Sequence, residues 1–274
     1  MKAMSQFLVA VAMVAAGCAA SAHAANDLCK VVPDPEKQRL DGFSEKRDLV
    51  TRHALLSVLS AVAYEDEGLG MYKLPEGWVR LPSRTHDSGL FVAVFENAEK
   101  NELVIAYRGT EAHSPKDWYH NVNPLFKTQS RPAMQHTENI IAERPGRRVM
   151  LTGHSLGGGL ALQLSHRIKN VAAVGFNPSP RIGLKKSGYA NYRAIFREKH
   201  DPLAVIRGNP SARRGWQLHY DALFDFSKGF VGVKAFKQHS IDVMAMNLLA
   251  LGAHWSPELA ELRGAICGDL STLD

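Results

Sequence analysis

The clearest chemical signal in the sequence is the pentapeptide at residues 153–157, which reads Gly-His-Ser-Leu-Gly. A short apolar run at 149–151, typical of a buried strand, precedes it, and an apolar stripe of helical period begins at Leu156. A Gly-x-Ser-x-Gly motif between a strand and a helix is a nucleophile elbow, a strained turn that lifts the serine hydroxyl above a sheet. We therefore expect Ser155 to act as a nucleophile and the Leu156 N–H, at a helix N-terminus, to stabilise a developing oxyanion.

A serine hydroxyl becomes a good nucleophile when a base can take its proton, and that base is commonly a histidine held by a carboxylate. With an elbow serine, the acid and then the histidine follow along the chain. Asp201 comes shortly after an expected strand at 192–196, and the ends of such strands project toward the crevice where ligands bind. His239 stands in an expected loop just before a helix. Asp201 is thus the preferred acid and His239 the preferred base.

Other residues stay open as candidates for both roles. Asp221 and Asp225 are rival acids, and His254, near the C-terminus, is the alternative base. His219 falls inside a strand-like run. His154 flanks the nucleophile, where a histidine is more typical of a structural hydrogen bond beneath the turn than of proton transfer.

A second oxyanion donor is expected from the loop that follows an earlier strand. Residues 107–110 read Tyr-Arg-Gly-Thr, in which Gly109 lets the backbone approach a substrate and Thr110 offers its N–H and its hydroxyl. The twelve histidines include no His-Glu-x-x-His or comparable ligand spacing. We expect neither a metal ion nor an organic cofactor.

Periodicity predicts the elements that must position these groups. Strands that alternate with helices around the elbow predict an α/β protein, with a mostly parallel central sheet and helices on both faces. Residues 109–132 contain three prolines and are expected to form a long loop. The expected strands lie at 78–81, 90–95, 103–107, 149–151, 171–176, 192–196 and 216–223, and the expected helices at 48–64, 132–143, 156–168 and 240–251.

The N-terminal segment has the pattern of an export signal. Lys2 precedes an apolar core, and residues 22–24 read Ala-His-Ala, a small-x-small cleavage site, so residues 1–24 are expected to be a signal peptide. Alternatively, residues 15–18 resemble a bacterial lipobox, in which a lipoprotein signal of residues 1–17 is removed and Cys18 is acylated. Residues 25–274 are expected to form a single domain that is periplasmic, secreted or, through Cys18, anchored to a membrane.

Export also bears on the cysteines and the charge. An oxidising compartment favours a disulfide between Cys29 and Cys267, the two cysteines outside the signal segment. The chain carries a net charge of +6, from basic residues that are not interleaved with aromatic ones. This pattern favours a solvated surface, leaves room for weak contact with an anionic membrane surface, and does not indicate nucleic-acid binding.

Together the motifs resemble those of the class 3 (fungal-type) lipases of the α/β-hydrolase superfamily. The resemblance implies that Ser155, Asp201 and His239 form a catalytic triad and that Thr110 and Leu156 form the oxyanion hole. The matching features, between residues 91 and 244, are Ala-Tyr-Arg-Gly-Thr at 106–110, Asp-Trp at 117–118, Asn121, Thr-Gly-His-Ser-Leu-Gly-Gly at 152–158, Asp-Pro at 201–202 and a late histidine.

The same resemblance implies a lid segment at 111–126 and carboxyl esters of lipids as substrates. The predicted function is a serine esterase or lipase that works through an acyl-enzyme intermediate. Export and positive charge suggest an alternative, a phospholipase directed at membrane phospholipids in the manner of a toxin-like effector. A non-catalytic lipid- or envelope-binding protein on the same fold is a third interpretation.

Overall fold

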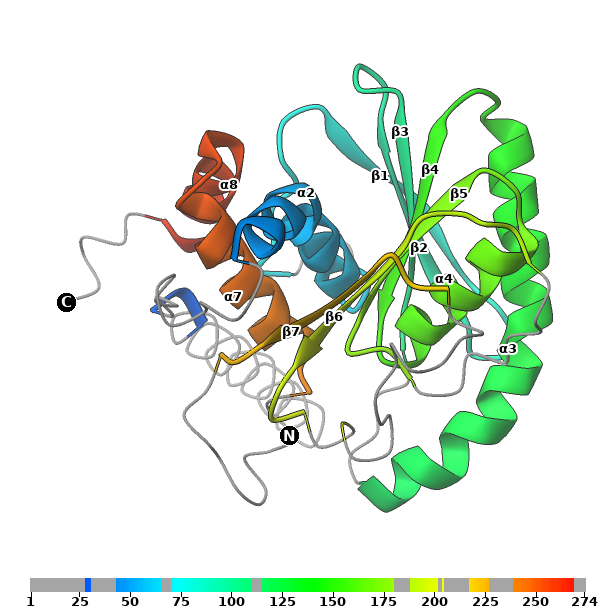
Figure 1. The fold of residues 1–274 in the computed structure, drawn as a ribbon. Coiled ribbons are helices and arrows are strands. Elements are labelled where there is room, and N and C mark those ends of the chain that lie inside the picture. The colour runs from blue at the N-terminus through cyan, green and yellow to red at the C-terminus, as the bar shows by residue number, and fades with distance from the viewer. Residues whose placement is uncertain are drawn as a thin grey trace, which may run out of the picture.

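The computed structural model describes residues 28–30, 43–65, 70–109, 115–179, 188–201, 204, 217–226 and 239–268. In this part of the chain the strands form one seven-stranded sheet, in the order β1-β2-β3-β4-β5-β6-β7 (Figure 1). The signal segment at 1–24, with Cys18, and the candidate oxyanion residue Thr110 lie outside the described residues. The strands are β1 (Trp78–Thr85), β2 (Phe91–Asn97), β3 (Glu102–Tyr107), β4 (Arg148–His154), β5 (Val171–Phe176), β6 (Arg193–Glu198) and β7 (Tyr220–Phe224).

The sheet is antiparallel at one side and parallel through the rest. β1, β2 and β3 pair in antiparallel fashion, whereas β3 to β7 are parallel. The register places Tyr107 opposite Gly153 and His154 opposite Phe176, so β3, β4 and β5 end at the same level. The predicted α/β architecture with a mostly parallel sheet is confirmed, and the segments that follow these strands meet at one edge of the sheet.

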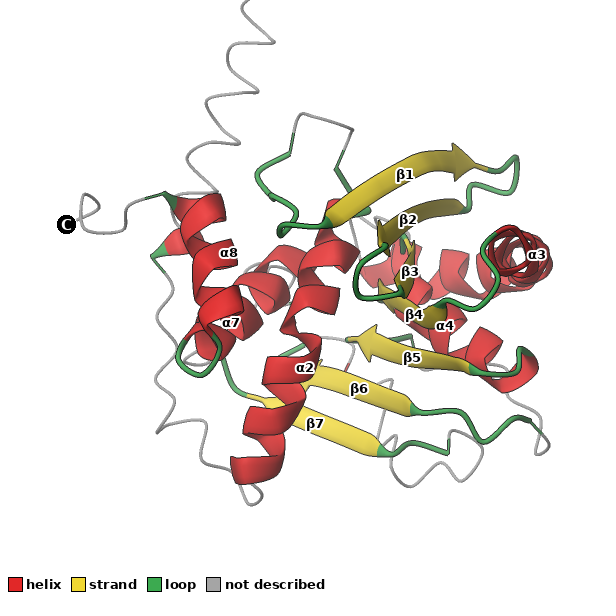
Figure 2. Cartoon of the chain, turned by 90° about the horizontal axis from the view of Figure 1, so that it is seen from above, coloured by secondary structure: helices red, strands yellow, loops and turns green. Residues whose placement is uncertain are grey.

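Alternation along the strands gives the sheet two apolar faces, because successive side chains point to opposite sides. One face packs against α3 (Pro115–Glu143) and α4 (Leu156–Arg167). The other packs against α2 (Phe43–Val62) and α7 (Ile241–Ala253), with α8 (Pro257–Cys267) beside α7 (Figure 2). In β2 and β3 the residues of the first face are Val92, Val94, Leu103 and Ile105, and those of the second are Ala93, Phe95, Val104 and Ala106.

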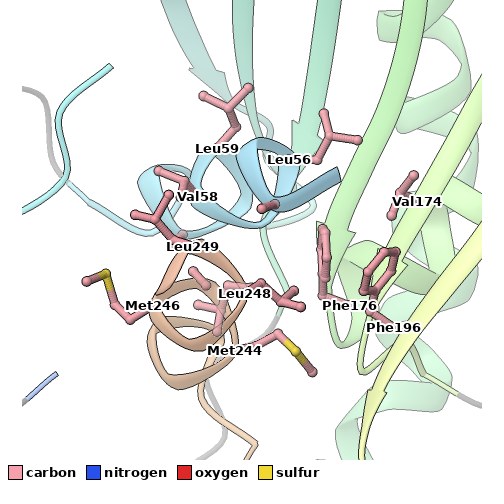
Figure 3. Packing of buried hydrophobic residues seen from close by; sticks show 14 of the residues in the cluster. Leu56, Val58, Leu59, Val174, Phe176, Phe196, Met244, Met246, Leu248 and Leu249 are labelled. Atoms are coloured by element: carbon pink, nitrogen blue, oxygen red, sulfur yellow. The ribbon is translucent and has the colours of Figure 1, made fainter. Parts of the chain in front are cut away.

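Helices α2 and α7 lie side by side on the second face. Figure 3 shows Leu56 of α2 and Leu248 of α7 gathered with Phe176 and Phe196 of the sheet in one buried cluster. Full burial of a large apolar side chain stabilises a fold by about 1.5 to 3 kcal/mol. The cluster therefore fixes both helices firmly against the sheet, which matters because the ends of both helices reach the edge where the elbow lies.

The expectation of a loop at 109–132 is wrong, because α3 is helical from Pro115 onward. Proline is tolerated in the first turn of a helix, but inside a helix it removes a hydrogen bond and costs about 3 kcal/mol. The helix continues through Pro132 because the turns that follow are buried against the sheet and α4. This tertiary packing offsets the local cost, and the buried residues are Ala133, Thr137 and Ile140. The implied lid segment at 111–126 begins outside the described residues and continues as the first turns of α3.

The other expected elements are present with shifted ends. α2 begins at Phe43 instead of residue 48, and β7 begins at Tyr220, while residue 216 lies outside the described residues. Helix α8 was not expected, although its start carries a recognisable signal: the Ser256 side chain accepts the Leu259 N–H, and Pro257 occupies the first turn.

Cys29 and Cys267 are joined by a disulfide that closes a separation of 238 residues. The bond ties the short segment at 28–30 to the end of α8. Arg263 Nη2 strengthens this attachment by donating to the Cys29 carbonyl at 3.3 Å. Among the helices that the structure describes, none combines the length and the apolar character needed to cross a bilayer.

Candidate active site

Ser155 lies in the tight turn between β4 and α4. Its backbone angles, φ 54° and ψ −120°, belong to a region that residues with side chains rarely adopt, so the turn stores strain. The turn is held because the Ser155 N–H donates to the Phe176 carbonyl at 3.1 Å. The Ser155 carbonyl in turn accepts from the N–H groups of Gly159, at 3.1 Å, and Ser179, at 2.8 Å. These contacts hold the serine at the end of β4 in the geometry of a nucleophile elbow.

The two glycines of the motif are required because there is no room for a side chain at either position. A Cβ added at Gly157 would lie 1.9 Å from the carbonyl oxygen of Tyr107, and one added at Gly153 would lie 2.6 Å from the same oxygen. Real Cβ atoms do not come this close to a backbone oxygen, and the neighbouring backbone is fixed in β3. Only glycine at both positions lets α4 begin so close to the sheet.

Three side chains are hydrogen-bonded in series at this edge of the sheet. Ser155 Oγ lies 3.0 Å from His239 Nε2, and His239 Nδ1 lies 3.0 Å from Asp201 Oδ1. The Asp201 side chain is completely buried and that of His239 is 15% exposed. If the Nδ1 proton is donated to the carboxylate, the Nε2 lone pair faces the serine hydroxyl. The structure thus brings together the residues preferred as nucleophile, base and acid.

Asp201 reaches the site from the turn after β6. Its N–H donates to the Glu198 carbonyl at 3.3 Å, and its own carbonyl accepts from Ala204 at 2.9 Å. The Glu198 carboxylate accepts the His200 N–H at 2.6 Å and so braces the same turn. Burial raises the pKa of Glu198 to about 7, although backbone hydrogen bonds from His200 and Phe226 act to lower it. A second acid of high pKa therefore lies in the turn that presents the candidate catalytic carboxylate, whose charge also acts to raise the pKa of Glu198.

His239 stands immediately before α7. Ser240 caps this helix, and its hydroxyl oxygen accepts the Asp242 N–H at 3.2 Å. The Tyr72 hydroxyl donates to Asp242 Oδ1 at 3.0 Å. Because the first turn of α7 is held from two directions, the His239 imidazole is directed toward the elbow, where its ring lies 4.6 Å from that of His154.

The elbow also presents a donor for an oxyanion. Leu156 is the first residue of α4, and an N–H at this position has no acceptor within its own helix. Gly109 lies against it, since a Cβ at Gly109 would be 3.3 Å from the Leu156 nitrogen. The end of the segment that follows β3 is therefore beside the elbow, as a second donor from Thr110 requires.

The alternative acids and the alternative base lie in other surroundings. Asp221 Oδ1 pairs with Arg197 Nε at 2.5 Å, and Asp225 pairs with Lys199 Nζ at 2.9 Å. His254 follows the C-terminal end of α7, a helix of 13 residues, and is therefore about 20 Å along the helix axis from His239. Within the described residues no group of three or more His, Cys, Asp or Glu side chains is arranged to bind a metal ion.

Two polar residues beside the site were not identified from the sequence. Glu198 ends β6, and Tyr64 lies just beyond the end of α2. A charged residue at the end of a buried strand is a signal that could have pointed to Glu198. Nothing near Tyr64 in the sequence distinguishes it, because its contacts are to residues 45 and 90 positions away.

A mostly parallel sheet with an elbow serine, a histidine and a carboxylate in series defines an α/β-hydrolase, whose characteristic chemistry is acyl transfer from esters. Residues 56–268 match the family model of the Tle-like phospholipase domain, which is described as phospholipase-like. Since the match covers most of the sequence, the chain belongs to this family. The predicted class of function, hydrolysis of the carboxyl esters of lipids, agrees with the description of this family.

Solved structures that match the chain include several lipases. One is the propeptide complex of Rhizomucor miehei lipase, with 15% identity over 63% of this chain and 66% of that chain, at a TM-score of 0.42. Another is a lipase from Rhizopus microsporus var. chinensis, with 13% identity over 67% of this chain and 76% of that chain, at a TM-score of 0.43. This chain thus spans just under two thirds of the first protein. No curated protein sequence matches it significantly.

Proposed function

We propose that the protein is an exported phospholipase that hydrolyses carboxyl ester bonds of membrane phospholipids through an acyl-enzyme on Ser155. The observation that carries the proposal is the series of two 3.0 Å hydrogen bonds from Ser155 through His239 to Asp201. Its occurrence in a chain that matches a phospholipase domain supports a phospholipid as the ester.

In the first half of the reaction, Ser155 Oγ attacks the ester carbonyl carbon while His239 Nε2 takes the hydroxyl proton. Asp201 accepts the Nδ1–H hydrogen bond and stabilises the imidazolium that forms. The Leu156 N–H, with that of Thr110, stabilises the negative charge on the carbonyl oxygen. Collapse of the tetrahedral intermediate breaks the ester C–O bond, and the imidazolium protonates the departing alkoxide.

In the second half, water replaces the alcohol. His239 takes a proton from the water molecule as its oxygen attacks the acyl-enzyme carbonyl, and the same amides again hold the oxyanion. Collapse returns the proton to Ser155 Oγ and releases the fatty acid. Every proton is transferred through one imidazole, so no metal ion or cofactor is required.

Three features support action outside the cytoplasm and on a polar lipid. Residues 1–24 read as a signal peptide, with acylation at Cys18 as the alternative, and the disulfide between Cys29 and Cys267 suits an oxidising compartment. The segment at 111–126 contains Lys116, Asp117 and His120 and is less apolar than a lid that is activated at a triglyceride interface, which favours a polar lipid as the substrate. Residues 25–274 then act as a single catalytic domain.

Fatty-acid release from phosphatidylglycerol–phosphatidylethanolamine vesicles, compared with release from an emulsified triglyceride, tests this proposal. We expect the vesicles to be hydrolysed faster and the Ser155→Ala variant to lose at least about 10⁴-fold of the activity on them without unfolding. Faster hydrolysis of the triglyceride would make the protein a neutral-lipid lipase. Full activity of the Ser155→Ala variant would refute the mechanism.

A further inference from the structure

Tyr64, just beyond the C-terminal end of α2, contacts two separate parts of the candidate active site. Its hydroxyl oxygen accepts the Gly109 N–H at 2.7 Å and lies 3.4 Å from His154 Nδ1. Gly109 is the residue before Thr110, and His154 is the residue before Ser155. One phenol therefore links the segment that carries the second candidate oxyanion donor to the turn that carries the nucleophile.

The Gly109 backbone fits closely between these groups. A Cβ at this position would lie 2.6 Å from Tyr64 Oη, 2.7 Å from the His154 carbonyl oxygen and 3.3 Å from the Leu156 nitrogen. Gly109 is thus enclosed by the tyrosine hydroxyl on one side and by the elbow on the other. The tyrosine contact therefore helps to set the distance between Gly109 and the Leu156 amide.

Tyr64 is itself held in place by its neighbours. Arg80 Nη1 donates to the carbonyls of Val62, at 3.4 Å, and Glu65, at 3.3 Å, on either side of Tyr64. The Arg108 guanidinium lies over the tyrosine ring, 5.3 Å from its centroid. The hydroxyl is therefore presented from a fixed backbone turn and a stacked ring, as a preorganised contact requires.

We propose that Tyr64 is a positioning residue that holds the backbone of Gly109 against the elbow, in line with the Leu156 amide that is to bind the oxyanion. This inference rests on the proposed function, in which the Leu156 amide and an amide from the segment after Gly109 stabilise the tetrahedral intermediate. Donors act on the transition state only when they are directed at the position where its charge develops. The hydroxyl thus acts on catalysis through Gly109, without touching the substrate.

The Tyr64→Phe variant tests the proposal, because it keeps the ring and its contact with Arg108 but removes the acceptor for Gly109. Tyr192→Phe is the matched control: it also removes a phenol hydrogen bond, at 2.8 Å to His53 Nε2, just before β6 and so at the other end of that strand from Asp201. With a soluble short-chain ester, we expect kcat of Tyr64→Phe to fall about 10- to 100-fold while KM stays within about twofold. We expect Tyr192→Phe to keep the kcat of the wild type.

A fluorophosphonate provides an independent readout, because its phosphoryl oxygen occupies the oxyanion position when it labels Ser155. The rate is measured well below the Tm of each variant, so that lost stability does not imitate lost alignment. Slower labelling of Tyr64→Phe, in proportion to its kcat, supports the inference. Labelling and kcat at the wild-type level, or a loss that appears only in KM, would overturn it. Failure of the wild type to be labelled would instead overturn the proposed function.

Discussion

The Asp201→Asn substitution tests the acid of the proposed triad most directly. The variant keeps the size of the side chain but removes its charge, at a position where the carboxylate is completely buried and 3.0 Å from His239 Nδ1. At this separation, with an effective dielectric constant of about 20, the attraction between a carboxylate and an imidazolium is about 5 kcal/mol. Because the imidazolium exists only after the serine proton has moved, this attraction stabilises the transition state more than the ground state.

The expected loss follows from that energy. Since about 1.4 kcal/mol corresponds to a factor of ten, kcat of the D201N variant should fall roughly 10³- to 10⁴-fold. A second effect acts in the same direction. The amide NH₂ of the new side chain favours the tautomer in which His239 Nε2 carries a proton and cannot accept one from Ser155.

The assay is hydrolysis of a soluble chromogenic ester, with the Tm measured on the same preparations. Asp221→Asn is the matched control, because it makes the same chemical change at a carboxylate that pairs with Arg197 and was a rival acid. We expect this control to keep kcat within about threefold of the wild type. A D201N variant that retains more than a tenth of the wild-type kcat, or a control that loses as much as D201N does, would refute the assignment.

Two further predictions concern stability. Burial raises the pKa of Glu198 from 4.5 to about 7, so the folded state favours the neutral acid. The free energy of unfolding should therefore decrease by up to about 3 kcal/mol as the pH rises from 4.5 to 7. Urea titrations of the Glu198→Gln variant over the same pH range should show a smaller decrease. If the free energy of unfolding of the variant decreases by the same amount, the pH dependence comes from groups other than Glu198. Replacing both Cys29 and Cys267 by alanine should lower the free energy of unfolding by about 3 to 5 kcal/mol, because the disulfide closes a loop across 238 residues. A urea midpoint equal to that of the wild type under non-reducing conditions would contradict this prediction.

The serine turn could be predicted from the sequence because its identifying residues are adjacent in the chain. The pentapeptide at 153–157 places Ser155 between a strand and a helix, and the structure adds the reason for the glycines at both ends, which is the closeness of the Tyr107 carbonyl oxygen in β3. Asp201 could be preferred to Asp221 because it follows a parallel strand, and such strand ends meet at one edge of a sheet, whereas Asp221 lies inside β7. Asp225 follows β7 and fits the same rule, and only the structure sets it apart, by pairing it with Lys199. The strands could also be predicted, because a short apolar run that is buried on both faces of a sheet is compatible with few other structures.

Local rules failed where packing outweighs them. Three prolines favoured a loop at 109–132, yet the burial of the next turns of α3 makes a helix more stable there. Position in a loop just before a helix favoured His239 over His254, but this local rule did not decide between them. The decision depended on which end of α7 lies beside the elbow, and that is set by the packing of α7 against α2 and the sheet.

The sequence by itself indicated the class of chemistry, because the five residues that identify the serine turn are adjacent in the chain, although contacts with Phe176 and Ser179 hold the turn in the fold. The sequence favoured Asp201 and His239 over their rivals, but the tertiary structure alone decided that these two side chains are hydrogen-bonded in series with that serine. His239 is 84 residues from Ser155, Asp201 is 38 residues from His239, and Tyr64 is 45 residues from Gly109. Contacts across such separations are made by the sheet register and by helices packed on its faces, so no local pattern of residues specifies them.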